Sequence, residues 1–182
     1  GDIAVLELDS WQLQGFGDLR ISPEIAIFSN LMPDHLNYYP DMQSYFSDKA
    51  NIFRNQSPSD ALFVEASVAQ IVSDTRPPAA VQIPPPIPAE WNLKILGEHN
   101  RINAALAAAA LRTAGLTEVE VRAGIESFSG VEGRFQPVRE VDGVRVKEPG
   151  GEQVGQPEVR VDRDLSCERG ECVRLDRRIE ED

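Results

Sequence analysis

Three side chains in the first 49 residues could together bind divalent metal ions. Glu7 lies near the end of one apolar run, His35 follows the next, and Lys49 lies on the apolar face of a helical pattern. Carboxylate oxygens suit Mg²⁺, and an imidazole binds metals or anionic groups. A buried, neutral lysine amine can react with CO2 to form a carbamate, which turns a cation into a metal-binding anion. These residue types therefore indicate a metal site if the fold brings them together.

Each of the three residues also has a purely structural explanation. Glu7 can be a surface acid, and His35 can be a capping or hydrogen-bonded loop residue. Lys49 can extend its amine from the apolar helix face into solvent. For any one of these residues taken alone, the structural explanation is the commoner one.

A second group of polar residues could bind a nucleotide. Asn100 and Asn103 open an alanine-rich segment three residues apart, so both can face one side of a helix's first turn. Amides can read an adenine edge through paired donors and acceptors. Arg134, which follows Gly130 and Gly133, could stack on a base or bind a phosphate. The alternatives are helix capping by Asn100 and an ordinary surface arginine in a turn.

The apolar patterns predict the elements that would position these residues. Strands are expected at 3–9, 24–29, 61–64 and 93–96, and helices at 41–55, 100–114 and 119–128. A hairpin is predicted over 136–147, with its turn at Asp142-Gly143. The glycines and proline between 10 and 23 suit a connection. The prolines of 77–88 predict a loop or an extended edge segment.

Strands that alternate with helices predict an α/β fold with a mainly parallel sheet flanked by helices. In such sheets ligands gather at the carboxyl ends of the strands, which is where Glu7 and His35 are expected. We assign residues 1–147 to this domain. Residues 148–182 contain no aromatic residue and are dense in Glu, Asp and Arg, so we predict a disordered tail.

Composition excludes some classes of function. The net charge is −12, with no basic stripe, which argues against a nucleic-acid partner. The apolar stretches are too short for a membrane span. Cys167 and Cys172 do not form a CxxC motif and are read as incidental thiols. A domain without disulfides suits the cytoplasm.

Five segments resemble the Mur ligase family, most closely its D-glutamate-adding members. Residues 5–13 resemble the family's LELSSFQL, with Asp9 at its first serine, and residues 30–36 resemble N-x-x-x-DHL. Residues 41–55 resemble Y-x-x-x-K-x-x-I-F-x-N, residues 97–106 resemble G-x-HN-x-x-NAL, and residues 130–135 resemble G-x-x-HRF. Their collinear order from 3 to 147 is more specific than any single motif.

The resemblance implies an ATP-dependent amide ligase. ATP would phosphorylate a carboxylate of UDP-N-acetylmuramoyl-L-alanine, and the amine of D-glutamate would attack the acyl phosphate. The product extends the cytoplasmic precursor of peptidoglycan, which implies a role in cell wall biogenesis, cell shape and cell division.

The resemblance also implies residue roles. Glu7 would bind the Mg²⁺ shared with the nucleotide phosphates, while His35 and the Lys49 carbamate would hold a second Mg²⁺ at the catalytic centre. The residues implied to contact ATP or to lie beside the UDP-sugar are Asn100, Asn103 and Arg134 for ATP and Ser10 for the sugar.

Parts of the family pattern are not found in this sequence. The glycine-rich phosphate loop should precede Glu7, and a UDP-binding domain and an NDSKATN segment should flank the matched region. We therefore expect further sequence upstream, and we expect this chain to be a fragment that is monomeric and inactive alone. The alternatives are another Mur or folylpolyglutamate-type ligase, and a non-catalytic α/β interaction module.

Overall fold

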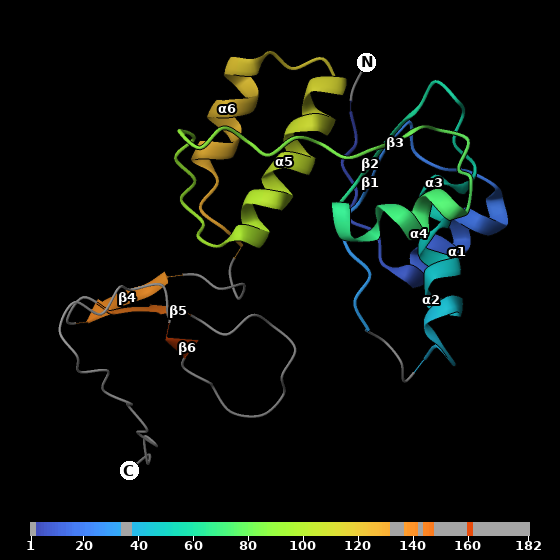
Figure 1. Ribbon diagram of the computed structural model, residues 1–182, viewed down its shortest axis with the longest axis horizontal. Helices are drawn as coiled ribbons and strands as arrows, with labels where there is room; N and C mark the ends of the chain where they lie inside the picture. The colour runs from blue at the N-terminus through green and yellow to red at the C-terminus, as the bar shows by residue number, and fades with distance from the viewer. Residues whose placement is uncertain (1–2, 34–37, 132–136, 142–143, 148–159, 162–182) are drawn as a thin grey trace, which may run out of the picture. The chain divides into compact units, whose positions relative to one another are not determined.

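The computed structural model describes residues 3–33, 38–131, 137–141, 144–147 and 160–161. These residues divide between two compact units, 1–129 and 130–182 (Figure 1). The residues predicted to carry the chemistry belong to the first unit, except Arg134.

The first unit is built on a parallel sheet of three strands. They are β1 (Ile25–Phe28), β2 (Ala61–Val64) and β3 (Val81–Gln82), in the order β1-β2-β3. Strands β1 and β2 pair from Ile25 opposite Ala61 to Phe28 opposite Val64. This confirms the predicted strands at 24–29 and 61–64 and the parallel α/β fold. It also confirms the extended edge segment predicted within 77–88, because β3 lies at the edge of the sheet beside β2.

Helices cover both faces of this sheet (Figure 1). On one face, Leu62 and Val64 of β2 join a buried cluster with α2 (Met42–Lys49), α3 (Asn51–Arg54), the 3₁₀ turn η1 (Ala66–Val68) and α4 (Ala69–Asp74). On the other face, Ala61 and Phe63 pack against Leu106 of α5 (Glu98–Thr113). Successive strand residues point to opposite faces, and covering both faces explains why all four residues of β2 are buried.

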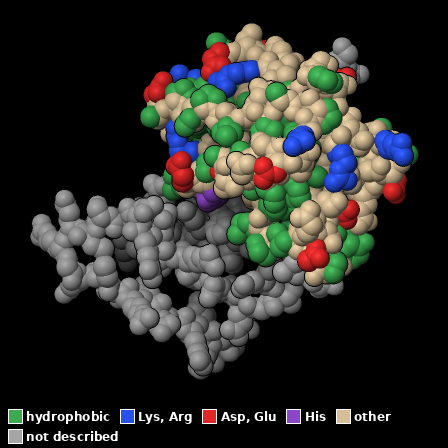
Figure 2. Space-filling view, turned by 45° about the vertical axis from the view of Figure 1, so that its right-hand side comes forward, with side chains coloured by type: hydrophobic (Ala, Val, Ile, Leu, Met, Phe, Trp, Pro, Cys, Tyr) green, Lys and Arg blue, Asp and Glu red, His purple; other side chains and the backbone are tan. Residues whose placement is uncertain are grey.

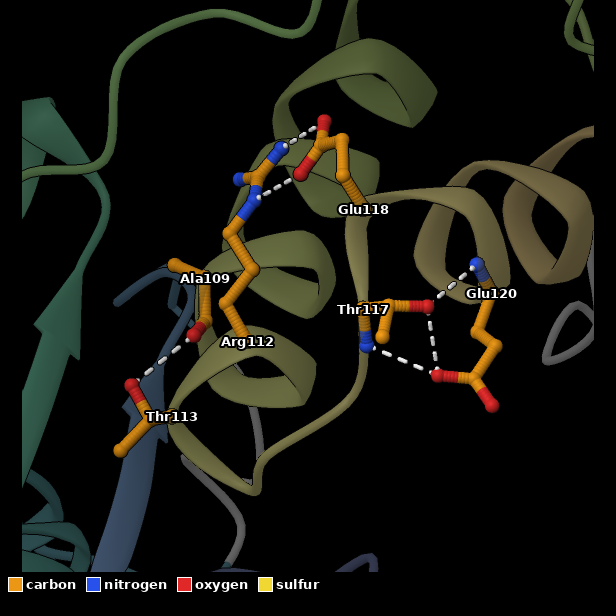
Figure 3. A network of polar contacts seen from close by, with 6 residues as sticks. All are labelled: Ala109, Arg112, Thr113, Thr117, Glu118 and Glu120. Carbon is orange, nitrogen blue, oxygen red and sulfur yellow. Dashed lines mark hydrogen bonds and ion pairs between the residues drawn. The ribbon is translucent and has the colours of Figure 1, made fainter.

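Helix α5 pairs with α6 (Glu118–Ser127) around a second buried cluster that includes Ile87 and Trp91. The connection between them is held by polar contacts (Figure 3). Arg112 binds both carboxylate oxygens of Glu118 at 2.7 Å, and Thr117 caps α6 in a reciprocal capping box with Glu120. The helices predicted at 100–114 and 119–128 are confirmed within two residues at each end.

The helix predicted at 41–55 is confirmed within one residue at each end, but it is interrupted at Ala50 and forms α2 followed by α3. Its end has a specific cause. The carbonyl of Asn51 accepts a hydrogen bond from the Ser22 hydroxyl at 2.7 Å, and that hydroxyl accepts one from the Asn55 amide at 3.0 Å. Ser22 thus stands where a direct helical bond from Asn55 to Asn51 would lie.

The prediction that residues 10–23 form only a connection is wrong, because α1 (Ser10–Leu19) is a helix. Its start is stabilised by a capping box: the Asp9 carboxylate accepts from the Gln12 amide, and the Gln12 side chain accepts from the Asp9 amide, both at 2.9 Å. The two glycines within the segment suggested a helix breaker, but the capping bonds and packing against α2 and α3 outweigh their low propensity.

The strands predicted at 3–9 and 93–96 are not formed. Ile3, Val5 and Leu6 are 65%, 88% and 64% exposed. Alternating apolar residues suit a strand, but a strand also needs a hydrogen-bonded neighbour, and among the described residues neither segment has one.

The second unit contains an antiparallel hairpin of β4 (Pro137–Val141) and β5 (Val144–Lys147), with Val141 opposite Val144. This confirms the hairpin predicted over 136–147, whereas its turn at Asp142-Gly143 lies outside the described residues. Strand β6 (Arg160–Val161) pairs with β5. Apart from β6, the tail that was predicted to be disordered from residue 148 lies outside the described residues.

Candidate active site

Five of the seven predicted site residues are described: Glu7, Ser10, Lys49, Asn100 and Asn103. His35 and Arg134 lie outside the described residues, so their predicted roles stay predictions.

Ser10 is the first residue of α1 and is buried, with 3% of its surface exposed. Tyr39, in the segment that leads into α2, is 5% exposed. Among the described residues, neither side-chain oxygen completes a hydrogen bond of ordinary geometry. Buried hydroxyls without a partner are uncommon, because desolvation is costly when no hydrogen bond replaces the lost water.

Groups on both neighbouring helices affect the pKa of Tyr39. Its pKa is raised, first because burial disfavours the phenolate, and further because of the Asp48 carboxylate, while the Ser10 hydroxyl opposes the rise. Asp48 is also bound by Gln14 of α1, whose Nε2 donates to Oδ2 at 2.6 Å. Three elements therefore meet at this point: the start of α1, the segment before α2, and the end of α2.

Lys49 follows Asp48 and is partly buried. Its Nζ lies 5.2 Å from the centre of the Tyr45 ring and 5.7 Å from that of Phe28. Nζ also donates a hydrogen bond of 3.4 Å to the Tyr45 hydroxyl. The amine therefore packs against aromatic rings instead of extending fully into solvent, as the structural alternative had supposed, and an ammonium is attracted to their faces.

A row of aromatic rings links this lysine to the surface. Trp11 lies edge-on to Tyr38 with ring centres 5.6 Å apart, Tyr38 contacts Tyr39 at 4.9 Å, and Tyr39 contacts Tyr45 at 5.2 Å. Trp11 and Tyr38 are exposed, whereas Tyr39 and Tyr45 are buried. The row runs from the start of α1 to the helix that bears Lys49, so it supports the same convergence of segments.

Glu7 is exposed and lies three residues before α1. The prediction that it ends a buried strand is wrong, for the reason given above. Within the described part of the chain, no group of three or more histidine, cysteine, aspartate or glutamate side chains could hold a metal ion. The predicted magnesium sites therefore depend on His35 and on modification of Lys49.

Asn100 and Asn103 both lie on α5, the first partly buried and the second exposed. The N-cap is Gly97 (φ +104°), so the alternative that Asn100 caps the helix is wrong. The Asn100 side chain instead donates to the Leu96 carbonyl at 2.7 Å. The φ of +104° at Gly97 is a backbone conformation that side chains rarely adopt, which explains the need for glycine beside these amides.

Sequence reasoning missed the polar residues that join α1 to α2 and α3. Asp48 and Tyr39 bear no recognisable motif, although Asp48 adjoins Lys49 and Tyr39 directly precedes Pro40. Asn51 is buried, donates through Nδ2 to the Leu13 carbonyl at 3.0 Å, and accepts from Arg54 at 2.8 Å. The signal available in the sequence was an asparagine two residues after a candidate lysine.

Figure 2 shows a face on which acidic and basic side chains are interspersed, with hydrophobic side chains between them. None of the described helices is both long and apolar enough to cross a lipid bilayer.

Comparison with known proteins points in one direction. Residues 1–83 match the family model described as the Mur ligase middle domain. The chain is similar to proteins named UDP-N-acetylmuramoylalanine–D-glutamate ligase. One from Roseiflexus sp. (strain RS-1) is 32% identical over 78% of this chain and 38% of its own length, and one from Geobacillus kaustophilus (strain HTA426) is 34% identical over 80% and 37%. A third, from Lawsonia intracellularis (strain PHE/MN1-00), is 34% identical over 78% and 32%. The chain thus spans between 32% and 38% of the length of these curated relatives.

Proposed function

The chain belongs to the Mur ligase family, and from this premise we propose that it is part of an ATP-dependent ligase that adds D-glutamate to UDP-N-acetylmuramoyl-L-alanine. The observation that carries this proposal is the similarity to D-glutamate ligases over 78–80% of the chain. The convergence of Ser10, Tyr39 and Asp48 beside Lys49 supports it, because it joins the first and third of the motif segments. The reaction would serve peptidoglycan synthesis in the cytoplasm.

We assign the metal-binding roles to three residues. Glu7 would hold the Mg²⁺ that also contacts the nucleotide phosphates, and His35 and a carbamate on Lys49 would hold the second. Mg²⁺ prefers oxygen ligands. Glu7 and a carbamate on Lys49 would supply oxygen atoms, whereas His35 would supply a nitrogen, which suits Mg²⁺ less well. Bound Mg²⁺ supplies charge neutralisation for the transferring phosphoryl group. The assignment of Lys49 rests on its place in the third motif segment, because the Tyr45 and Phe28 rings beside Nζ attract an ammonium and give no support to an anionic carbamate.

Substrate and nucleotide roles fall to the remaining residues. Asn100 and Asn103 lie on one helix, which supports a shared contact with the adenine base. Arg134 would contact ATP as well, and Ser10 would lie beside the UDP-sugar. The intact enzyme would act as a monomer, and this chain alone would not turn over substrate.

A binding experiment tests these assignments without requiring turnover. The ¹⁵N-labelled chain is titrated separately with ATP and Mg²⁺, with UDP-N-acetylmuramoyl-L-alanine, and with D-glutamate, and amide shifts are followed by NMR. We expect ATP to shift Asn100 and Asn103, and the UDP-sugar to shift the residues around Ser10.

Two comparisons make the result specific. UDP-N-acetylmuramoyl-tripeptide should bind at least tenfold more weakly than the alanyl substrate, and preference for the tripeptide would favour another Mur ligase. The absence of shifts with every ligand would count against the binding roles assigned to Asn100, Asn103 and Ser10. Amide-bond formation by the chain alone would contradict its predicted inactivity.

A further inference from the structure

The segment that leads into α5 is held in place by contacts that carry an inference beyond the residue roles proposed above. We call residues 87–96 the strap. It follows β3 and contains neither helix nor strand. Figure 1 shows it passing α5 and α6 and returning to the start of α5. Because the strap belongs to no helix or sheet, its backbone groups need other partners where they are buried.

Apolar side chains anchor the first part of the strap. Ile87 and Trp91 are each 5% exposed and lie in the buried cluster shared by α5 and α6, and Leu93 packs against that cluster. Beyond this point the burial ends, because Lys94 and Leu96 are exposed. The path of the last residues before α5 therefore depends on polar contacts.

Two such contacts tie the strap to the end of α6. The Glu126 carboxylate accepts a hydrogen bond from the Asn92 amide at 2.9 Å, and Lys94 Nζ donates to the Ser127 carbonyl at 3.1 Å. Ser127 is the last residue of α6, where the helix dipole also favours a cation. Arg122, one turn earlier on α6, donates to the same Glu126 oxygen at 3.1 Å and so helps to orient the carboxylate. The end of α6 thus fixes the strap as it approaches α5.

The strap ends at a carbonyl that orients one of the side chains assigned to nucleotide binding. Asn100 Nδ2 donates to the Leu96 carbonyl at 2.7 Å. A carbonyl can only accept, so the amide nitrogen faces Leu96, and the amide oxygen is the end that Asn100 can offer to a ligand. Adenine carries an exocyclic amine that donates hydrogen bonds, whereas hypoxanthine carries a carbonyl at the same position. The direction of this one amide therefore bears on which base is accepted.

We propose that Glu126 and Lys94 are positioning residues of the nucleotide site: they hold the strap against α6 and so fix the Leu96 carbonyl that orients the Asn100 amide. They act through the strap and do not contact the nucleotide. The assignment of ATP to Asn100 rests on the proposed function, whereas the link from α6 through the strap to the Asn100 side chain does not.

The first test follows the Asn100 side chain in the ¹⁵N-labelled full chain. In Glu126→Ala, loss of the acceptor should shift the Asn100 side-chain NH₂ signals and speed solvent exchange of the Asn92 amide by about threefold or more. In Glu126→Gln an oxygen can still accept from Asn92, so both measurements should stay near the wild-type values. Thr117→Ala is the matched control, because it removes the cap at the other end of α6 and should lower the Tm without changing either measurement.

Three results would overturn the proposal. They are Asn100 signals that stay in place in Glu126→Ala, signals that move equally in Thr117→Ala, and signals that move equally in Glu126→Gln. If Glu126→Ala fails to fold, Lys94→Met tests the same link, because Lys94 is exposed and its replacement leaves the α6 side chains intact. Unchanged Asn100 signals in that variant would then reject the proposal.

The second test measures nucleotide selectivity, which a merely stabilising role of Glu126 would not change. With Mg²⁺ present, the wild-type chain should bind ATP up to about tenfold more tightly than ITP, because the Asn100 oxygen accepts from the adenine amine and opposes the hypoxanthine carbonyl. The ratio of the two dissociation constants should move toward one in Glu126→Ala and stay at the wild-type value in Thr117→Ala.

The outcomes of this second test separate the positioning role from the proposed function. Equal affinity of the wild-type chain for ATP and ITP, or an unchanged ratio in Glu126→Ala, refutes the role in nucleotide selection. If the wild-type chain binds neither nucleotide, the result counts against the proposed function, and the first test alone decides whether α6 orients the Asn100 amide.

Discussion

The side chain of Asn51 fills the space beside Gly17, where a Cβ would lie 2.5 Å from Nδ2 and 2.8 Å from Cγ. Because Asn51 is also bonded to the Leu13 carbonyl and to Arg54, it cannot withdraw without breaking buried hydrogen bonds. This contact sets how closely α1 approaches α3, and hence where the start of α1 lies relative to α2.

Substitution of Gly17 by alanine should therefore destabilise the fold. We expect a loss of about 1–3 kcal/mol in the free energy of unfolding, as for an overpacked core site. Gly15 is the matched control on the same helix, since a Cβ there would meet nothing within 4 Å. Gly15→Ala should stabilise the chain by about 0.5–1 kcal/mol through helix propensity. Urea unfolding of the two variants decides the point, and equal effects would contradict the proposed contact.

The stability of the buried cluster between the sheet and helices α2 and α3 should depend on Phe53. This side chain is 1% exposed and packs against Phe28 with ring centres 5.9 Å apart. Phe53→Ala should cost about 3–5 kcal/mol, because the cavity cannot close fully. Phe128 is 46% exposed at the end of α6, so the same substitution there should change stability by less than about 1 kcal/mol. Comparable losses measured by denaturant unfolding would mean that the α2–α3 layer packs differently.

Two threonines near the α5–α6 connection should respond in opposite ways (Figure 3). Thr117 caps α6, so Thr117→Ala should cost about 0.5–2 kcal/mol. Thr113 donates its hydroxyl to the Ala109 carbonyl within the last turn of α5, a bond that adds little to helix stability. Thr113→Ala should be neutral or stabilising by about 0.5 kcal/mol. A larger loss at Thr113 than at Thr117 in thermal unfolding would refute the capping assignment.

The Arg112–Glu118 pair should contribute to stability only above acidic pH. Hydrogen bonding to Arg112 lowers the pKa of Glu118 in the folded chain. The unfolded chain then binds the proton more readily, so the contribution is present above the unfolded pKa of about 4.3 and is lost as pH falls through the lowered folded value. A ¹³C titration of the Glu118 carboxyl should show its pKa rising toward the ordinary value in Arg112→Met. Arg122→Met, which instead removes the partner of Glu126, should leave Glu118 unchanged. The reverse pattern would contradict the pairing.

Much of the fold could be predicted from the sequence because its determinants are local. Strand β2 is a short apolar run after a turn, and α5 is a long alanine-rich segment followed by Gly115 at φ +95°. In both, propensity and pattern agree over consecutive residues. The family could be predicted as well, since it depends on the order and spacing of motifs along the chain.

The tertiary structure alone decided the features that depend on distant partners. Helix α1 contains two glycines and depends on its capping box and on Asn51, which lies 34 residues after Gly17. Residues 3–9 have a strand pattern and no strand, because hydrogen bonding to a neighbour cannot be read from the segment itself. The meeting of Ser10, Tyr39 and Asp48 is likewise a product of packing between α1 and α2. Side-chain chemistry and local periodicity are encoded residue by residue, whereas the pairing of distant polar groups depends on how the layers pack.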